Sequence, residues 1–160
     1  MNPTQPAALQ TTAPLDEVRV QLIWLWMVGC AVPFFLLIGQ SVMRVYEPKT
    51  QDVWSWFLPN ILPSLTVMIS TLVLTASDAA TGAAVVRKSF VSITRALSIA
   101  YLFAISLTIL LQPIAATADG QDRIALMKLS NLWLAPLQGL VSSAIGALFI
   151  TKEKKDKKEG

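Results

Sequence analysis

Residues 20–38 read VQLIWLWMVGCAVPFFLLI, an uninterrupted run without a charged side chain. An apolar helix of about 20 residues is long enough to cross a hydrocarbon core about 30 Å thick. Three more uncharged runs follow at residues 57–75, 96–114 and 133–150. Because every backbone polar group must be hydrogen-bonded inside lipid, the four runs predict four transmembrane helices.

The composition agrees with a membrane protein. Hydrophobic residues make up 54% of the chain, charged residues only 14%, and the mean hydropathy is +0.56. These values differ from those of an ordinary soluble domain. We predict an all-α membrane protein, a four-transmembrane-helix bundle over residues 18–151. The expected spans are about 20–43, 57–76, 93–114 and 132–151. Residues 1–17 are predicted to be a disordered cytoplasmic tail, and residues 152–160 a charged cytoplasmic tail.

The orientation follows from the lysines and arginines, which prefer cytoplasmic loops. One side holds Arg19, Arg87, Lys88, Arg95, Lys152, Lys154, Lys155, Lys157 and Lys158. The other side holds Arg44, Lys49, Arg123 and Lys128. The first set is larger, which predicts that both termini are cytoplasmic. Short loops, a retained first span and a lysine-rich tail favour a bacterial inner (plasma) membrane.

Tryptophans are expected at the membrane interface, where their amphipathic rings lie at headgroup depth. The candidate anchors are Trp24, Trp26, Trp54, Trp56 and Trp133. A weak internal repeat accompanies them, because the second and fourth spans open with WFLP at residues 56–59 and WLAP at residues 133–136. One interpretation is two parallel hairpin repeats related by an axis along the membrane normal. The other is two ordinary interfacial tryptophans without duplication.

Several residue types that carry chemistry are missing. The chain has no histidine, a single cysteine at position 30, and no acidic residue inside any apolar run. Imidazole ligation, histidine-based general-base catalysis and an intramembrane proton carrier are therefore not expected. No phosphate-binding glycine loop or nucleophile elbow is present. We predict no enzymatic activity, no metal, no cofactor and no nucleic-acid partner.

Uncharged polar and small residues gather on two predicted helix faces. Asn60, Ser64, Thr71 and Thr75 follow one stripe of the second span. Gly139, Ser142, Ser143 and Gly146 mark two adjacent stripes of the fourth. Small residues and hydroxyls at such spacing favour helix packing. The alternative is a hydrated pathway lined by the stripe of the second span.

Prolines lie inside three of the spans, at Pro33, Pro59, Pro63 and Pro136. Each proline lacks the N–H that would bond to the carbonyl four residues earlier, so a kink or local unwinding is expected. Pro63, for example, frees the carbonyl of Pro59. Such a carbonyl either coordinates a cation, as in broken transporter helices, or is satisfied by a neighbouring helix or by water.

Three functional hypotheses remain open. The first is a non-enzymatic, homo-oligomeric membrane protein that acts as a sensor, an effector or an anchoring subunit. It would contact the lipid bilayer, further copies of itself and a cytoplasmic protein bound at the inner loop or tail. The second is an oligomeric pore or channel, ion-conducting or holin-like. Short spans followed by a charged, basic terminus resemble phage holins in composition, although no motif is shared. The third is a carrier with an uncharged polar site.

Overall fold

The computed structural model describes residues 12–76, 85–119 and 123–150. Its helices are α1 (Leu15–Val42), α2 (Thr50–Ala76), α3 (Lys88–Asp119) and α4 (Arg123–Ile150). All four are long and apolar enough to cross a membrane. The predicted all-α, multi-pass bundle is thus confirmed. Two three-residue strands, β1 (Thr12–Pro14) and β2 (Val85–Arg87), pair antiparallel beside it.

The helices extend beyond the predicted spans. Residues 12–17, expected in a disordered tail, form β1 and the first turn of α1. Asp16 and Glu17 lie in that turn, where negative charge favours the positive end of the helix dipole. Asp52 has the same position in α2, so this helix begins well before the apolar run. The rest of the predicted tails, residues 1–11 and 152–160, lies outside the described residues.

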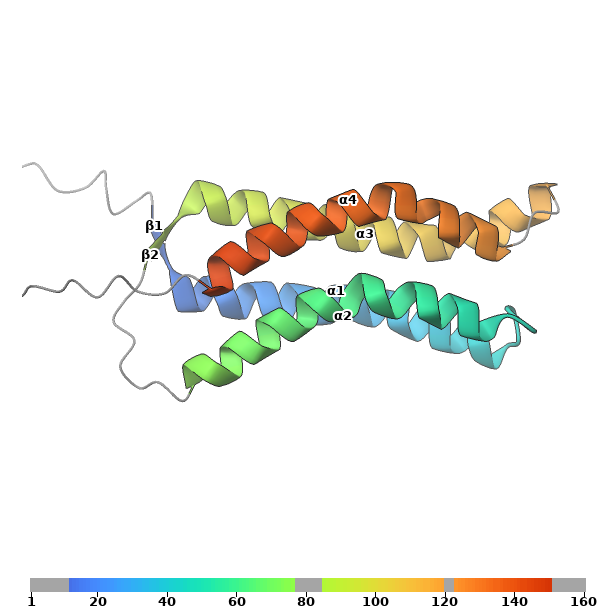
Figure 1. The fold of residues 1–160 in the computed structure, drawn as a ribbon, viewed down its shortest axis with the longest axis horizontal. Helices are drawn as coiled ribbons and strands as arrows, with labels where there is room; N and C mark the ends of the chain where they lie inside the picture. The colour runs from blue at the N-terminus through green and yellow to red at the C-terminus, as the bar shows by residue number, and fades with distance from the viewer. Residues whose placement is uncertain (1–11, 77–84, 120–122, 151–160) are drawn as a thin grey trace, which may run out of the picture.

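The four helices lie along one long axis as two stacked hairpins, α1–α2 and α3–α4 (Figure 1). α4 packs most extensively against α3 and α2, whereas α1 packs against α3 and α2. The order around the bundle is therefore α1, α2, α4, α3. A two-fold axis along the bundle would place α1 diagonally opposite α3, but here they are neighbours. The internal repeat stays a prediction, and the helix order does not follow that symmetry.

Close packing joins α1 to α3. A Cβ atom at Gly29 would lie only 2.6 Å from Leu102 Cδ1, so the missing side chain lets the two helices approach closely. Nearby, the Trp26 ring lies 6.0 Å from the ring of Tyr101, measured between centroids. Both side chains are fully buried. Aromatic and aliphatic packing of this kind holds the centre of the bundle together.

Arg19 connects the beginning of α1 to the end of α4. Its Nε donates to Leu148 O and its Nη2 to Phe149 O, each at 3.2 Å. Its Cζ also lies 5.8 Å from the centroid of the Phe149 ring. Carbonyls at a helix C-terminus have no partner within the helix, and the dipole there favours a positive charge. Arg19 is 7% exposed and acts as a cap for α4, a role that the sequence pattern did not indicate.

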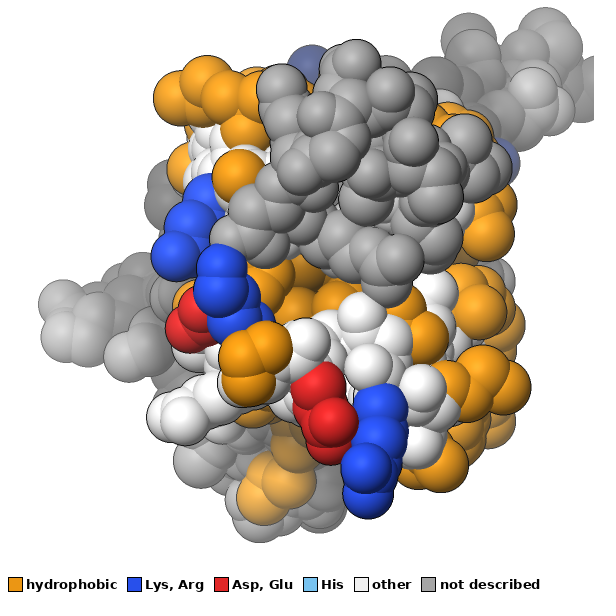
Figure 2. Space-filling model, turned by 90° about the vertical axis from the view of Figure 1, so that its right-hand side faces the viewer, with side chains coloured by type: hydrophobic (Ala, Val, Ile, Leu, Met, Phe, Trp, Pro, Cys, Tyr) orange, Lys and Arg blue, Asp and Glu red, His pale blue; other side chains and the backbone are white. Residues whose placement is uncertain are grey.

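The opposite end of the bundle carries charges of both signs beside hydrophobic side chains (Figure 2). The connection between α1 and α2 lies there. In it Arg44 Nε is 3.5 Å from Glu47 Oε1. Tyr46 is buried and donates its hydroxyl to Gln40 Oε1. Trp54 Nε1 donates to Ser41 Oγ at 3.2 Å. These bonds close the hairpin of α1 and α2.

Candidate functional site: a polar centre and an apolar groove

Polar side chains from three helices meet inside the bundle. This polar centre consists of Asn60 and Ser64 from α2, Tyr101 from α3, and Gln138 and Ser142 from α4. Asn60, Ser64 and Tyr101 are buried. A buried polar group is costly unless it is hydrogen-bonded, so the partners of these atoms decide what the centre does.

Tyr101 connects α3 to α2 across the centre. Its hydroxyl donates to Asn60 O at 2.7 Å, and Asn60 Oδ1 lies 3.4 Å away. The Asn60 amide donates in turn to Trp56 O at 2.7 Å. The sequence pattern did not single out Tyr101. A tyrosine in the middle of an apolar run was the available signal, because a buried hydroxyl needs a partner.

Gln138 satisfies the carbonyl that Pro63 frees. Its Nε2 donates to Pro59 O at 3.0 Å and lies 3.4 Å from Asn60 O. Of the two expected possibilities for this carbonyl, cation coordination and contact with a neighbouring helix, the structure has the second. The sequence predicted the freed carbonyl but not its donor, because Gln138 is distant in the chain and lies on another helix.

This pairing predicts a coupling between Pro63 and Gln138. Gln138→Leu should lower the free energy of unfolding by about 1 kcal/mol, because Pro59 O loses its donor. In a Pro63→Ala background, the new backbone N–H can bond to Pro59 O, and the same substitution should cost clearly less. A double-mutant cycle by reversible unfolding in bicelles measures the difference. Equal costs in both backgrounds would show that the Gln138 bond does not replace the missing helix bond.

The predicted stripe of the second span is divided in the structure. Ser64 Oγ and Ser142 Oγ lie 3.3 Å apart between α2 and α4. Thr71 instead donates back to Val67 O of its own helix at 2.8 Å. The side chain of Thr75 lies outside the described residues. Asn60 and Ser64 therefore lie between helices of one chain. The bond from Thr71 to Val67 O, in contrast, stays within α2.

The small residues of α4 are likewise divided between two faces. Ser142 points to α2, and Gly146 is half-buried. Gly139 and Ser143 are exposed, and the Ser143 hydroxyl donates to Gly139 O at 2.8 Å. Apart from its chain neighbours and the backbone of its own helix, no atom lies within 4 Å of the position that a Gly139 Cβ would take. Gly139 and Ser143 thus belong to the outer surface of the bundle.

The prolines do not interrupt the helices. Pro33 lies within α1, Pro59 and Pro63 within α2, and Pro136 within α4. Of the two expected effects near residues 56–64, a kink or local unwinding, unwinding is not observed: α2 is one continuous helix through this segment. Neighbouring side chains that bond to the freed carbonyls, as Gln138 does, allow a transmembrane helix to continue through proline.

The five tryptophans divide into surface and core. Trp24 and Trp133 are exposed, at 66% and 50%, and Trp54 is half-buried. Trp26 is completely buried, and Trp56 is 6% exposed. The expectation that these last two contact lipid headgroups is therefore wrong. The spacing of apolar residues all around a membrane helix does not distinguish its lipid-facing side from its packed side.

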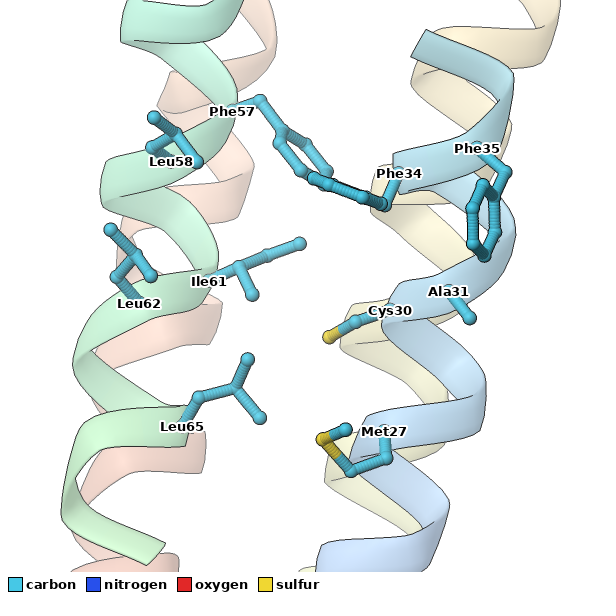
Figure 3. A pocket seen from close by; sticks show the side chains of 10 residues that line it. All are labelled: Met27, Cys30, Ala31, Phe34, Phe35, Phe57, Leu58, Ile61, Leu62 and Leu65. Atoms are coloured by element: carbon cyan, nitrogen blue, oxygen red, sulfur yellow. The ribbon is translucent and has the colours of Figure 1, made fainter. Parts of the chain in front are cut away.

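An apolar groove of about 320 Å³ lies between α1 and α2. Figure 3 shows side chains of both helices around this gap, among them Cys30 and Phe34 from α1 and Phe57, Ile61 and Leu65 from α2. All the lining side chains are apolar apart from the thiol. Phe34 lies 5.8 Å from Trp54 and 6.5 Å from Phe57 between ring centroids. This aromatic cluster forms one end of the groove.

The described residues contain no group of three or more histidine, cysteine or acidic residues that would hold a metal ion. Comparison of the chain with protein-family models, curated proteins and solved structures gives no match. A function is therefore inferred from the geometry of the bundle itself.

Proposed function

We propose that this chain is a non-enzymatic integral membrane protein that associates with copies of itself and acts as a membrane-embedded sensor, effector or anchoring subunit. The observation that carries the proposal is a stripe of small, exposed residues on α4. Its members are Ala135, Gly139, Ser143 and Ala147. They are spaced four residues apart, so they follow one face of the helix. We call this set the small-residue stripe.

A stripe of this kind suits contact between membrane helices. Lipid tails are as apolar as leucine, so helices associate in a bilayer mainly through close packing and hydrogen bonds, which small residues allow. Beside the stripe, Leu132 and Leu140 are 71% and 58% exposed. Small side chains along the stripe leave room for the backbone of a second helix to approach α4 closely. The Ser143 hydroxyl is already bonded within its own helix, so the contact needs no further polar partner.

The polar centre argues against a pore lined by the second span. A pore lined by the second span would need Asn60 and Ser64 to face a central conduit formed by several copies. In this chain both are buried and bond to atoms of the same bundle. Turning them toward water would break the contacts to α3 and α4. The polar stripe is thus better explained as packing within one copy.

We further propose that both termini are cytoplasmic, in a bacterial inner membrane. The support is the unequal distribution of basic residues along the sequence. Arg87 and Lys88 are exposed at the end of the bundle where β1 pairs with β2. A soluble partner of an anchoring subunit would bind at this end, because the loops at the other end are too short to form a second binding surface.

Substituting Gly139 with leucine tests the association. In one isolated copy a Cβ at this position meets no atom of another helix within 4 Å, so the fold should be kept. In an oligomer it should separate the two α4 helices and weaken association by roughly tenfold or more, equivalent to about 1.4 kcal/mol. Förster transfer between labelled copies in liposomes, titrated by dilution with lipid, measures the effect.

Gly39→Leu is the matched control, because a Cβ at Gly39 also has no atom within 4 Å but lies on α1. It should leave energy transfer unchanged. A wild-type protein that stays monomeric at every protein-to-lipid ratio would contradict the proposal. Equal effects of the two substitutions would place the contact elsewhere on the surface.

A further inference from the structure

We propose that the groove between α1 and α2 binds one acyl chain of a membrane lipid. The proposal does not depend on the small-residue stripe, which lies on α4. The groove has a volume of about 320 Å³, at the lower end of the range of sites for small ligands. Its lining offers no hydrogen-bond donor or acceptor other than the Cys30 thiol. The ligand is therefore a hydrocarbon.

The depth of the groove matches one leaflet. Along α1 the lining runs from Met27 to Phe35, a rise of about 12 Å at 1.5 Å per residue. Half of a hydrocarbon core is about 15 Å thick. Met27 lies near the middle of the 28-residue α1, and Phe35 lies nearer the connection to α2. The groove therefore runs from about the bilayer centre toward one surface, along the direction of an acyl chain.

The headgroup of such a lipid would lie at the depth where polar side chains of the protein begin. Above the aromatic end of the groove, Trp54 Nε1 bonds to Ser41 Oγ, and Arg44 follows at the end of α1 with 78% of its side chain exposed. Phe34 packs against both Trp54 and Phe57. Tryptophan is typical of the boundary between hydrocarbon and headgroups. The groove thus ends at the depth where an acyl chain joins its headgroup.

The size of the groove favours an acyl chain over a partner helix as its ligand. A helix with side chains is about 10 Å across, which is too wide to enter a groove of 320 Å³ along its length. A single alkyl chain is narrow and flexible enough to fill it. Phe57 and Ile61 are buried at 2% and 4% exposure, so the floor of the groove is already formed within one copy. The acyl chain of the lipid would contact these residues between α1 and α2.

The test uses the full-length protein in liposomes that contain a phospholipid with a diazirine on one acyl chain. After illumination, mass spectrometry of peptides locates the labelled residues. Labelling is expected to concentrate on groove residues such as Met27 and Leu65. Exposed positions of α1 outside the groove, such as Val28 and Val32, should be labelled much less. If all exposed positions of the wild-type protein were labelled to the same extent, the proposal would be overturned.

A pair of variants sharpens the result. Leu62→Trp places a large ring in the groove, whereas Ile69→Trp places it seven residues further along the same face of α2, outside the lining. The two residues are similarly exposed, at 50% and 47%. Leu62→Trp should lower groove labelling by roughly tenfold, and Ile69→Trp should leave it unchanged. Unchanged labelling in Leu62→Trp would overturn the proposal. Efficient cross-linking of two copies through Cys30 would also overturn it, since a protein would then occupy the groove.

Discussion

Replacing Tyr101 with alanine is expected to lower the free energy of unfolding by about 3 kcal/mol, at the lower end of the range for large-to-small changes of aromatic residues. The ring is completely buried and packs against Trp26. Its loss leaves a cavity between α1 and α3 and removes the donor to Asn60 O. The lower end of the range applies because packing, not transfer from water, drives helix association in lipid.

Tyr101→Phe separates the two contributions. This variant keeps the ring and removes only the hydroxyl, so it should cost about 1 kcal/mol. Reversible unfolding in bicelles, monitored by tryptophan fluorescence, measures both variants. A cost for Tyr101→Ala no larger than that for Tyr101→Phe would show that the ring makes no contribution to the packing of α1 on α3.

Replacing Arg19 with methionine is expected to lower the free energy of unfolding by about 2 kcal/mol. Leu148 O and Phe149 O would lose their donors at the end of α4, and a buried acceptor without a partner costs about 1–3 kcal/mol. The favourable charge at the helix C-terminus and the contact with the Phe149 ring would also be lost. Methionine keeps much of the length of the side chain, so the packing changes little.

Arg44→Met is the matched control at the other end of α1. Its side chain is 78% exposed, and its Nε lies 3.5 Å from Glu47 Oε1. Exposed ion pairs of this kind contribute little to stability, so the change should be small. Hydrogen exchange provides a second measurement, because Arg19→Met should increase exchange of the last turn of α4 selectively. Equal effects of the two substitutions would contradict the capping role of Arg19.

The sequence was sufficient for the number of helices and their approximate positions. Runs such as residues 20–38 are long, uncharged and separated by charged segments, and a bilayer allows few structures other than helices. Hydropathy was less informative about the ends. Asp16 and Asp52 favour the first turns of α1 and α2, so these helices begin in polar sequence before the apolar runs.

The candidate site was predicted only in part. Asn60, Ser64 and Pro63 were recognisable as polar or helix-breaking residues in an apolar run. Their partners were not, because Tyr101 and Gln138 belong to other helices and lie far away in the sequence. No sequence pattern indicated the groove, since its lining consists of apolar residues that any membrane span contains.

The sequence by itself determined that the chain forms four apolar helices, because the requirement to satisfy backbone polar groups in lipid acts on each segment separately. Only the tertiary structure decided that Trp26 is in the core while Trp24 is exposed. It likewise decided that Gln138 bonds to Pro59 O and that Gly139 faces outward. In a bilayer the packed side and the lipid-facing side of a helix are equally apolar. The choice between them depends on shape and hydrogen bonding with the other helices, and hydropathy does not encode either.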